Sequence, residues 1–224
     1  MKQSFIIATV IFASSFKLAA QTSTAVSGTD KKFISAMETN LHILDTAGSV
    51  TSFVMLANNF ERIATAEKTK WEPFYYAAYC YAVMAVSAPD KTKIDMLADK
   101  AELWLQQANN LQKNNSEIAA LFAMIKSSKI MVDPINRWQS LGQEVGQHLG
   151  EAKQVDPTNP RPWLIEARIK FNTPEGLGGG KEPAKTLITE AIQKFSNFKP
   201  QSSIAPVWGL RPAEMFLEKL NAPK

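Results

Sequence analysis

Apolar residues recur every three or four positions along almost the whole chain, and this spacing constrains the fold more than any other feature. In the first such segment, Phe33, Met37, Leu41 and Leu44 fall on one face of a helix. Residues 71–88 are apolar over most of a helix circumference, as in a helix packed on several sides. Alternating strand patterns are absent from the sequence. An all-α fold is therefore predicted, with helices over residues 31–47, 49–68, 71–88, 92–112, 116–132, 135–155, 160–171, 183–195 and 212–220.

The first 20 residues have the layout of a secretory signal peptide. Lys2 precedes an apolar run over residues 5–16, and the small residues Ala19 and Ala20 follow it. The run is shorter than the roughly 20 residues that a membrane-spanning helix needs. We therefore expect cleavage after Ala20 and export to the periplasm; a retained N-terminal anchor is the alternative. Residues 21–30 are small and polar and are expected to form a disordered leader to a helical domain over residues 31–224.

Charge and cysteine content narrow the classes of function. The formal net charge is +4, and removal of the signal peptide lowers it by two because Lys2 and Lys17 leave with it. Acidic and basic residues are interspersed, which argues against a nucleic-acid partner. The single cysteine, Cys80, cannot form an internal disulfide and lies in an apolar stretch where a buried side chain is expected.

A recurring turn pattern indicates an internal repeat. In each copy a large apolar residue is followed three positions later by alanine and then by a polar turn, at Leu105 and Ala108, Leu149 and Ala152, and Ile188 and Ala191. The turn DPTNPRPW is the most specific copy, because Pro157 lies five residues after Ala152 and Trp163 and Ala167 follow in the next helix. This pattern resembles the tetratricopeptide repeat, a helix–turn–helix unit of about 34 residues.

The resemblance implies a right-handed solenoid of antiparallel helix pairs, with divergent repeats and long loops within them. The repeats cover residues 71–196, preceded by an irregular helix pair over 31–70 and followed by a C-terminal cap over 197–224. A generic helical bundle is the alternative architecture. In this family the first helix of each pair lines a concave groove, which implies groove positions at Tyr75, Tyr79, Met124, Arg161, Arg168 and Asn172.

These groove residues favour binding over catalysis. Two tyrosines, a methionine and two arginines suit a peptide or helix of an envelope or periplasmic partner, and the arginines could clamp a carboxylate. A non-enzymatic interaction scaffold is therefore the leading hypothesis. The alternative is a small-ligand or solute-binding component of a periplasmic uptake system, with a pocket between the glycine-rich loop at 176–180 and Trp208.

Patterns for other chemistry are weak. The stretch PEGLGGGKEP lacks the spacing and the hydroxyl residue of a phosphate-binding loop, and it follows a helical segment instead of a strand. It resembles glycine-rich loops of exported tetratricopeptide-like proteins from Bacteroidota-type bacteria, and we expect a turn between helices; anion binding by its backbone is the alternative. Glu144 and His148 share a helix face but form at most half a metal site. We predict no catalytic residue, no metal and no cofactor.

Overall fold

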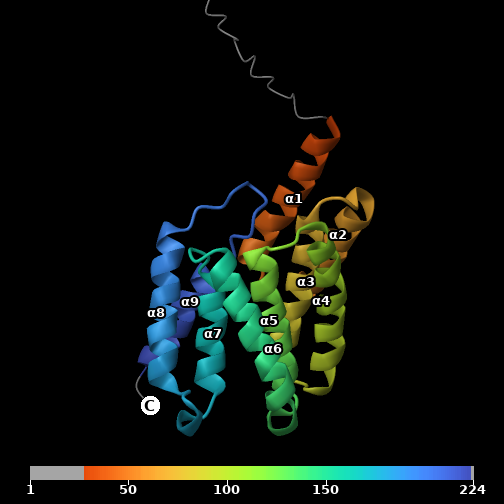
Figure 1. Cartoon of the computed structure of the whole chain (residues 1–224). Coiled ribbons are helices and arrows are strands. Elements are labelled where there is room, and N and C mark those ends of the chain that lie inside the picture. The colour runs from red at the N-terminus through yellow and green to blue at the C-terminus, as the bar shows by residue number, and fades with distance from the viewer. Residues whose placement is uncertain (1–27, 223–224) are drawn as a thin grey trace, which may run out of the picture.

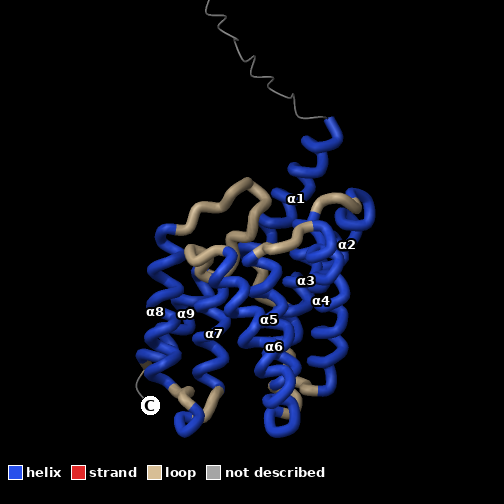
Figure 2. The backbone as a smooth tube through the Cα atoms, viewed as in Figure 1, coloured by secondary structure: helices blue, strands red, loops and turns tan. Residues whose placement is uncertain are grey.

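Helices make up most of residues 28–222, the part of the chain that the computed structural model describes (Figure 2). They are α1 (Gly28–Thr46), α2 (Val50–Glu67), α3 (Trp71–Val86), α4 (Thr92–Leu111), α5 (Ser116–Ile130), α6 (Pro134–Val155), α7 (Arg161–Asn172), the short 3-10 helix η1 (Glu175–Leu177), α8 (Lys181–Asn197) and α9 (Leu210–Asn221). Residues 28–222 contain no strand, so the all-α prediction is confirmed. The predicted signal peptide and residues 21–27 of the predicted leader lie outside the described residues, and α1 begins at Gly28 instead of Lys31.

Consecutive helices form hairpins that stand side by side in chain order (Figure 1). The pairs are α3–α4, α5–α6 and α7–α8, and their first helices are neighbours, because α3 contacts α5 and α5 contacts α7. The α1–α2 pair precedes this series, and α9 packs against α8 at its other end. This order agrees with the predicted succession of helix pairs. The handedness of the stack and its tetratricopeptide identity stay predictions.

Helices α4 and α5 begin at the predicted residues, and polar side chains just before each helix bind its first backbone N–H groups. The carbonyl oxygen of the Asn115 side chain accepts the backbone N–H groups of Glu117 and Ile118 at 2.9 and 3.2 Å, so Asn115 caps α5. Thr92 is the first residue of α4, and its N–H donates to the Asp90 carboxylate at 3.0 Å.

Helix α3 lies at the centre of the largest apolar cluster. It contacts α2, α4 and α5, which explains why it is apolar on nearly every side. Its alanines Ala77, Ala78 and Ala82 are fully buried, which permits close approach of the neighbouring helices. Cys80 is also fully buried, as expected, and burial raises the pKa of its thiol.

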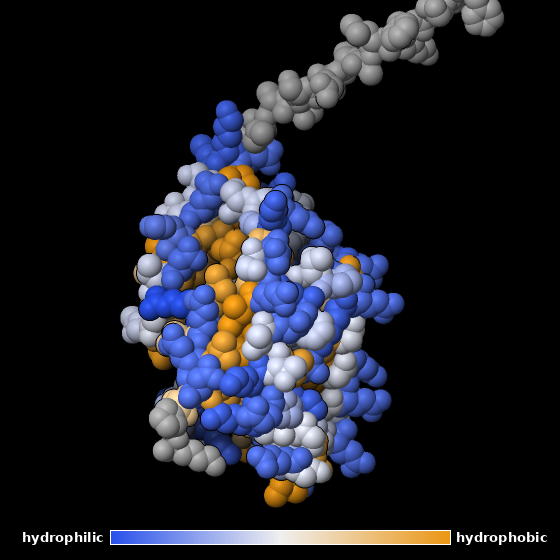
Figure 3. Space-filling view, turned by 90° about the vertical axis from the view of Figure 1, so that its left-hand side faces the viewer, coloured by the Kyte–Doolittle hydropathy of each residue, from blue (hydrophilic) through white to orange (hydrophobic). Residues whose placement is uncertain are grey.

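Residues 198–209, here called the strap, cross one end of the stack and lead into α9 (Figure 1). Gly209 makes the final turn with a φ of 118°, a conformation that favours glycine. Helix α9 then buries Ala213 and Leu220. Within the predicted C-terminal cap, Val207 and Met215 are 44% and 59% exposed, whereas Trp208 packs inward. Figure 3 views the side of the molecule where α8 and α9 lie, and it shows an apolar stripe on that side.

Candidate functional site

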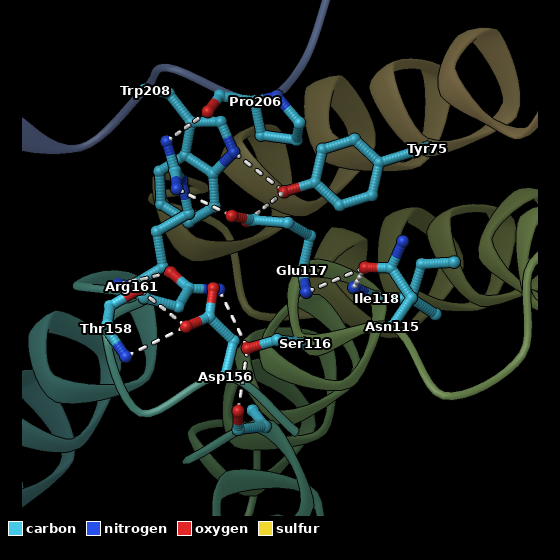
Figure 4. Close-up of polar contacts among 12 residues, drawn as sticks. Tyr75, Asn115, Ser116, Glu117, Ile118, Asp156, Thr158, Arg161, Pro206 and Trp208 are labelled. Atoms are coloured by element: carbon cyan, nitrogen blue, oxygen red, sulfur yellow. Dashed lines mark hydrogen bonds and ion pairs between the residues drawn. The ribbon is translucent and has the colours of Figure 1, made fainter. Parts of the chain in front are cut away.

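A buried ion pair holds the strap against the ends of α5 and α7 (Figure 4). Arg161, the first residue of α7, is fully buried, and its Nη1 lies 2.7 Å from Oε1 of Glu117 on α5. Its Nη2 donates to the backbone carbonyl of Pro206 at 2.6 Å. The guanidinium also lies 4.8 Å from the ring centre of Phe198 and 5.2 Å from that of Trp208. Both Nη atoms of Arg161 are therefore engaged, one by α5 and one by the strap, whereas its buried Nε has no hydrogen-bond partner among the described residues.

Tyrosines of α3 hold the strap from the other side. The Tyr75 hydroxyl accepts the indole N–H of Trp208 at 2.8 Å and lies 3.4 Å from Oε2 of Glu117, to which it donates. The neighbouring Tyr76 donates its hydroxyl to the backbone carbonyl of Ile204 at 3.2 Å. The Trp208 ring stacks on Tyr79 with ring centres 4.5 Å apart. These contacts join α3 to a segment more than one hundred residues away in the sequence.

A second set of polar contacts fixes the turn that begins α7. Asn159 accepts the backbone N–H of Arg161 on its side-chain oxygen at 3.0 Å and donates its amide to the Ser116 hydroxyl at 2.9 Å. That hydroxyl in turn donates to the backbone carbonyl of Ala152 at 2.7 Å. Asn159 and Ser116 therefore tie the turn before α7 to the start of α5 and to the end of α6.

Burial shapes the electrostatics of this network. Burial raises the pKa of the Glu117 carboxyl. The positive charge of Arg161 lowers this pKa, but by less than burial raises it. Burial, followed by the negative charge of Glu117, raises the pKa of the Tyr75 hydroxyl. Both groups are covered and hydrogen-bonded, so the network positions the strap and offers no exposed acid or base.

The predicted groove residues separate into two groups. Tyr75, Tyr79 and Arg161 are buried under the strap, so they cannot line an open groove as the sequence predicted. Met124 and Arg168 are half-buried. Asn172 is exposed and donates its amide to the backbone carbonyl of Arg168 at 2.9 Å. Binding by these residues stays a prediction.

Aromatic side chains lie near Arg168 on α7. We call this set the aromatic patch: Phe171, Trp208 and Phe216, together with Arg168. Phe171 and Phe216 meet edge to face, with ring centres 5.5 Å apart, and the Arg168 guanidinium lies 5.9 Å from the Phe216 ring centre. Arg168 is also close enough to Tyr79 to interact with it electrostatically.

Trp208 connects the patch to the rest of the core. It is half-buried and packs against the three apolar clusters found in residues 28–222. Met124 of α5 packs against two of these clusters. The patch draws on α7, α9 and the strap, and it combines apolar rings with one positive charge. Such a surface suits a flat, apolar ligand that carries an acidic group.

The comparisons with known proteins agree with a binding role. No family model matches the chain, and no curated protein matches it. Among solved structures, the HusA haemophore from Porphyromonas gingivalis superposes with a TM-score of 0.75 at 31% sequence identity. The match covers 87% of this chain and 96% of that protein. The chain belongs to the HusA family. HusA is a binding protein, not an enzyme, and comes from a Bacteroidota species, the group that the sequence resemblance indicated.

In this HusA-family chain backbone N–H groups of the glycine-rich loop are hydrogen-bonded within the loop and to the end of α7. The N–H groups of Gly178 and Gly180 donate to the backbone carbonyls of Glu175 and Lys170 at 2.9 and 2.8 Å, so these donors are not free for an anion. Both glycines have positive φ angles, 75° and 102°, which confirms the expected turn between two helices. The loop follows the end of α7, whereas the Trp208 ring lies near Arg161 at the start of this helix. A pocket between the loop and Trp208 stays a prediction.

Glu144 and His148, considered from the sequence as half of a metal site, each contact other side chains in the described part of this HusA-family chain. Glu144 pairs with Lys126 at 3.0 Å, and His148 lies 3.7 Å from Glu151 and stacks on Phe122. No group of three potential metal ligands occurs in residues 28–222. Among the described helices, none is both long enough and apolar enough to cross a membrane.

Sequence reasoning missed two members of the patch as binding candidates. Phe171 lies three residues after Arg168 on α7, and this spacing placed the two side chains on neighbouring positions of one helix face. Phe216 was assigned to the C-terminal cap, and only the fold shows that α9 brings it back to α7. The amphipathic pattern of α9 was the one sequence signal that it packs on the domain.

Proposed function

We propose that this chain is an exported, non-enzymatic protein that binds haem or a closely related tetrapyrrole. The observation that carries the proposal is the 31% identity to a haemophore over 96% of that protein's length. Haem is a flat, largely apolar ring with two carboxylates. Its binding requires apolar or aromatic contacts for the ring and positive or hydrogen-bonding groups for the acids.

The aromatic patch supplies groups of both kinds. Phe171, Phe216 and Trp208 offer aromatic surface, and Arg168 offers the charge. Met124 of α5 has a side chain able to ligate haem iron, and it packs against two of the apolar clusters that Trp208 also contacts. His148 is engaged by Phe122 and Glu151 on α5 and α6, away from the patch.

Of the two functions predicted from the sequence, small-ligand binding now has the stronger support. The strap occupies the region where a peptide would meet Tyr75, Tyr79 and Arg161, so the scaffold would lose half of its predicted contacts. A tetratricopeptide-like solenoid and a periplasmic location remain part of the proposal. Neighbouring first helices support the former, and the haemophore relative supports export.

An absorption titration tests the function directly. Purified residues 21–224 would be titrated with haem at fixed, low detergent concentration, and the Soret band of haem would be followed. We expect a saturable change of the band with a defined stoichiometry. A matched titration of the double variant Phe171→Ala/Phe216→Ala should show weaker binding. A Soret band that responds to the wild-type chain no more than to the detergent blank would refute the proposed function.

A further inference from the structure

We propose that Arg168, assisted by Lys219, is the carboxylate-recognising group of the ligand site; this inference rests on the proposed function. The ligand class is then narrower than a tetrapyrrole in general. It is a planar aromatic ring that carries free carboxylates at one edge.

Arg168 lacks an anionic partner. Its guanidinium makes no hydrogen bond and no ion pair with any described residue, although it is half-buried between the ring of Phe216 and the Tyr79 side chain. Removing a positive charge from water without a partner is unfavourable. Burial accordingly lowers the pKa of Arg168.

Arg161 is an arginine of this fold whose charge is paired. It lies on the same helix seven residues earlier, and Glu117 and the Pro206 carbonyl meet its two Nη atoms at 2.7 and 2.6 Å. No carboxylate plays that part for Arg168 among the described residues. The fold therefore engages one arginine internally and leaves the other for an anion from outside.

A second cation flanks the same aromatic pair. Lys219 on α9 lies with its Nζ 5.3 Å from the ring centre of Phe171, whereas Arg168 lies over Phe216. Lys219 forms no ion pair with a described residue and is exposed. Each ring of this edge-to-face pair of phenylalanines therefore has one positive group near its face. A planar ligand that rests on these rings places its acidic edge within reach of one or both cations.

The guanidinium is the stronger recognition element. Its planar fork can donate two parallel hydrogen bonds to one carboxylate, whereas an ammonium acts as a point charge. The aromatic surroundings exclude water from part of the contact, which strengthens the charge–charge interaction. Arg168 is thus assigned the main share of carboxylate selectivity, and Lys219 the smaller share.

The test compares two ligands on matched variants. Haem with free propionates and haem dimethyl ester would be titrated, under the same detergent conditions, against the wild-type chain, Arg168→Gln, Arg168→Lys and Lys219→Gln. Arg211→Gln is the control, because Arg211 is an exposed arginine of α9 outside the patch and its removal changes the net charge equally. Melting of each unliganded variant checks that it is folded.

We expect Arg168→Gln to weaken binding of the free acid about tenfold to a hundredfold. It should change the affinity for the ester by no more than about threefold. The ester has no carboxylate to pair with a guanidinium, so neither the wild type nor Arg168→Gln forms a charge-assisted pair with it. Arg168→Lys should fall between Gln and wild type, and Arg211→Gln should match wild type. If Arg168→Gln does not fold, Arg168→Lys carries the same comparison.

The outcomes separate this inference from the proposed function. Suppose that the wild-type chain binds haem but that the ratio of the affinities for the acid and the ester is unchanged in Arg168→Gln and Arg168→Lys. Carboxylate recognition by Arg168 is then refuted and the proposed function stands. Carboxylate recognition by Arg168 is equally refuted if, among the variants, only Arg211→Gln lowers the affinity for the acid. If the wild-type chain binds neither ligand, both proposals are wrong.

Discussion

Replacing Arg161 with methionine tests the role of the buried network most sharply. The substitution keeps much of the side-chain volume but removes the charge. It leaves Glu117, whose side chain is only 13% exposed, without its ion-pair partner and leaves the Pro206 carbonyl without its donor. Breaking a buried pair by removing one partner costs about 3–5 kcal/mol. For a domain of this size each kcal/mol corresponds to about 2–4 °C, so the melting temperature should fall by roughly 6–20 °C.

The loss should depend on pH and on Glu117. Burial raises the pKa of Glu117, so its neutral form is the one that the folded state tolerates best without Arg161. Protonation removes the uncompensated charge, and the destabilisation by Arg161→Met should therefore be smaller near pH 5 than near pH 8. Adding Glu117→Gln should recover part of the loss at pH 8, because the double variant has no stranded charge.

Urea unfolding followed by circular dichroism measures these free energies for the wild type, the two single variants and the double variant. The reasoning fails if Arg161→Met costs less than about 1 kcal/mol, the range of an exposed ion pair. It also fails if the double variant loses the sum of the two single losses, because the two side chains would then not be coupled.

Two further predictions concern other parts of the fold. Gly179→Ala should lower the free energy of unfolding by about 1–3 kcal/mol, because an added Cβ would lie 2.1 Å from the carbonyl oxygen of Thr173, whereas Gly176→Ala meets no atom within 4 Å and should be nearly neutral in the same urea titration. Burial against Phe122 lowers the pKa of His148 below its ordinary value, so the stability that neutral His148 provides is present at pH 7 and is lost as the pH falls through the unfolded-state pKa near 6.5. His148→Gln should therefore lose less stability than wild type between pH 7 and pH 5, and equal losses would contradict this account of the histidine.

The helices were predictable because their signals are local. A three- and four-residue spacing of apolar side chains needs no knowledge of the partner helix, and it located every α-helix between α1 and α9. Glycines in the loop before α8 were interpretable for the same reason, since a positive φ angle is a property of one residue. Helix ends were harder to predict where two residues able to cap a helix are adjacent, as at Asn115 and Ser116. Asn115 caps α5 because the Ser116 hydroxyl is taken by the backbone carbonyl of Ala152, which is distant in the sequence.

The candidate site was less predictable because it depends on contacts between distant segments. Nothing near Trp208 in the sequence indicates that it will stack on Tyr79 and bond to Tyr75. The two arginines of α7 look alike in the sequence, yet Glu117 meets only one of them. Their different roles follow from which segment each faces, and this is set by the path of the strap across the helix ends.

The structure of the haem complex tests the central claim most directly. The account predicts a ring that rests on Phe171 and Phe216 near Trp208, with a propionate oxygen within hydrogen-bond distance of the Arg168 guanidinium. The strap should remain in place, held by Arg161. A ring bound away from Phe171 and Phe216, or anywhere with its propionates away from Arg168, would contradict the account.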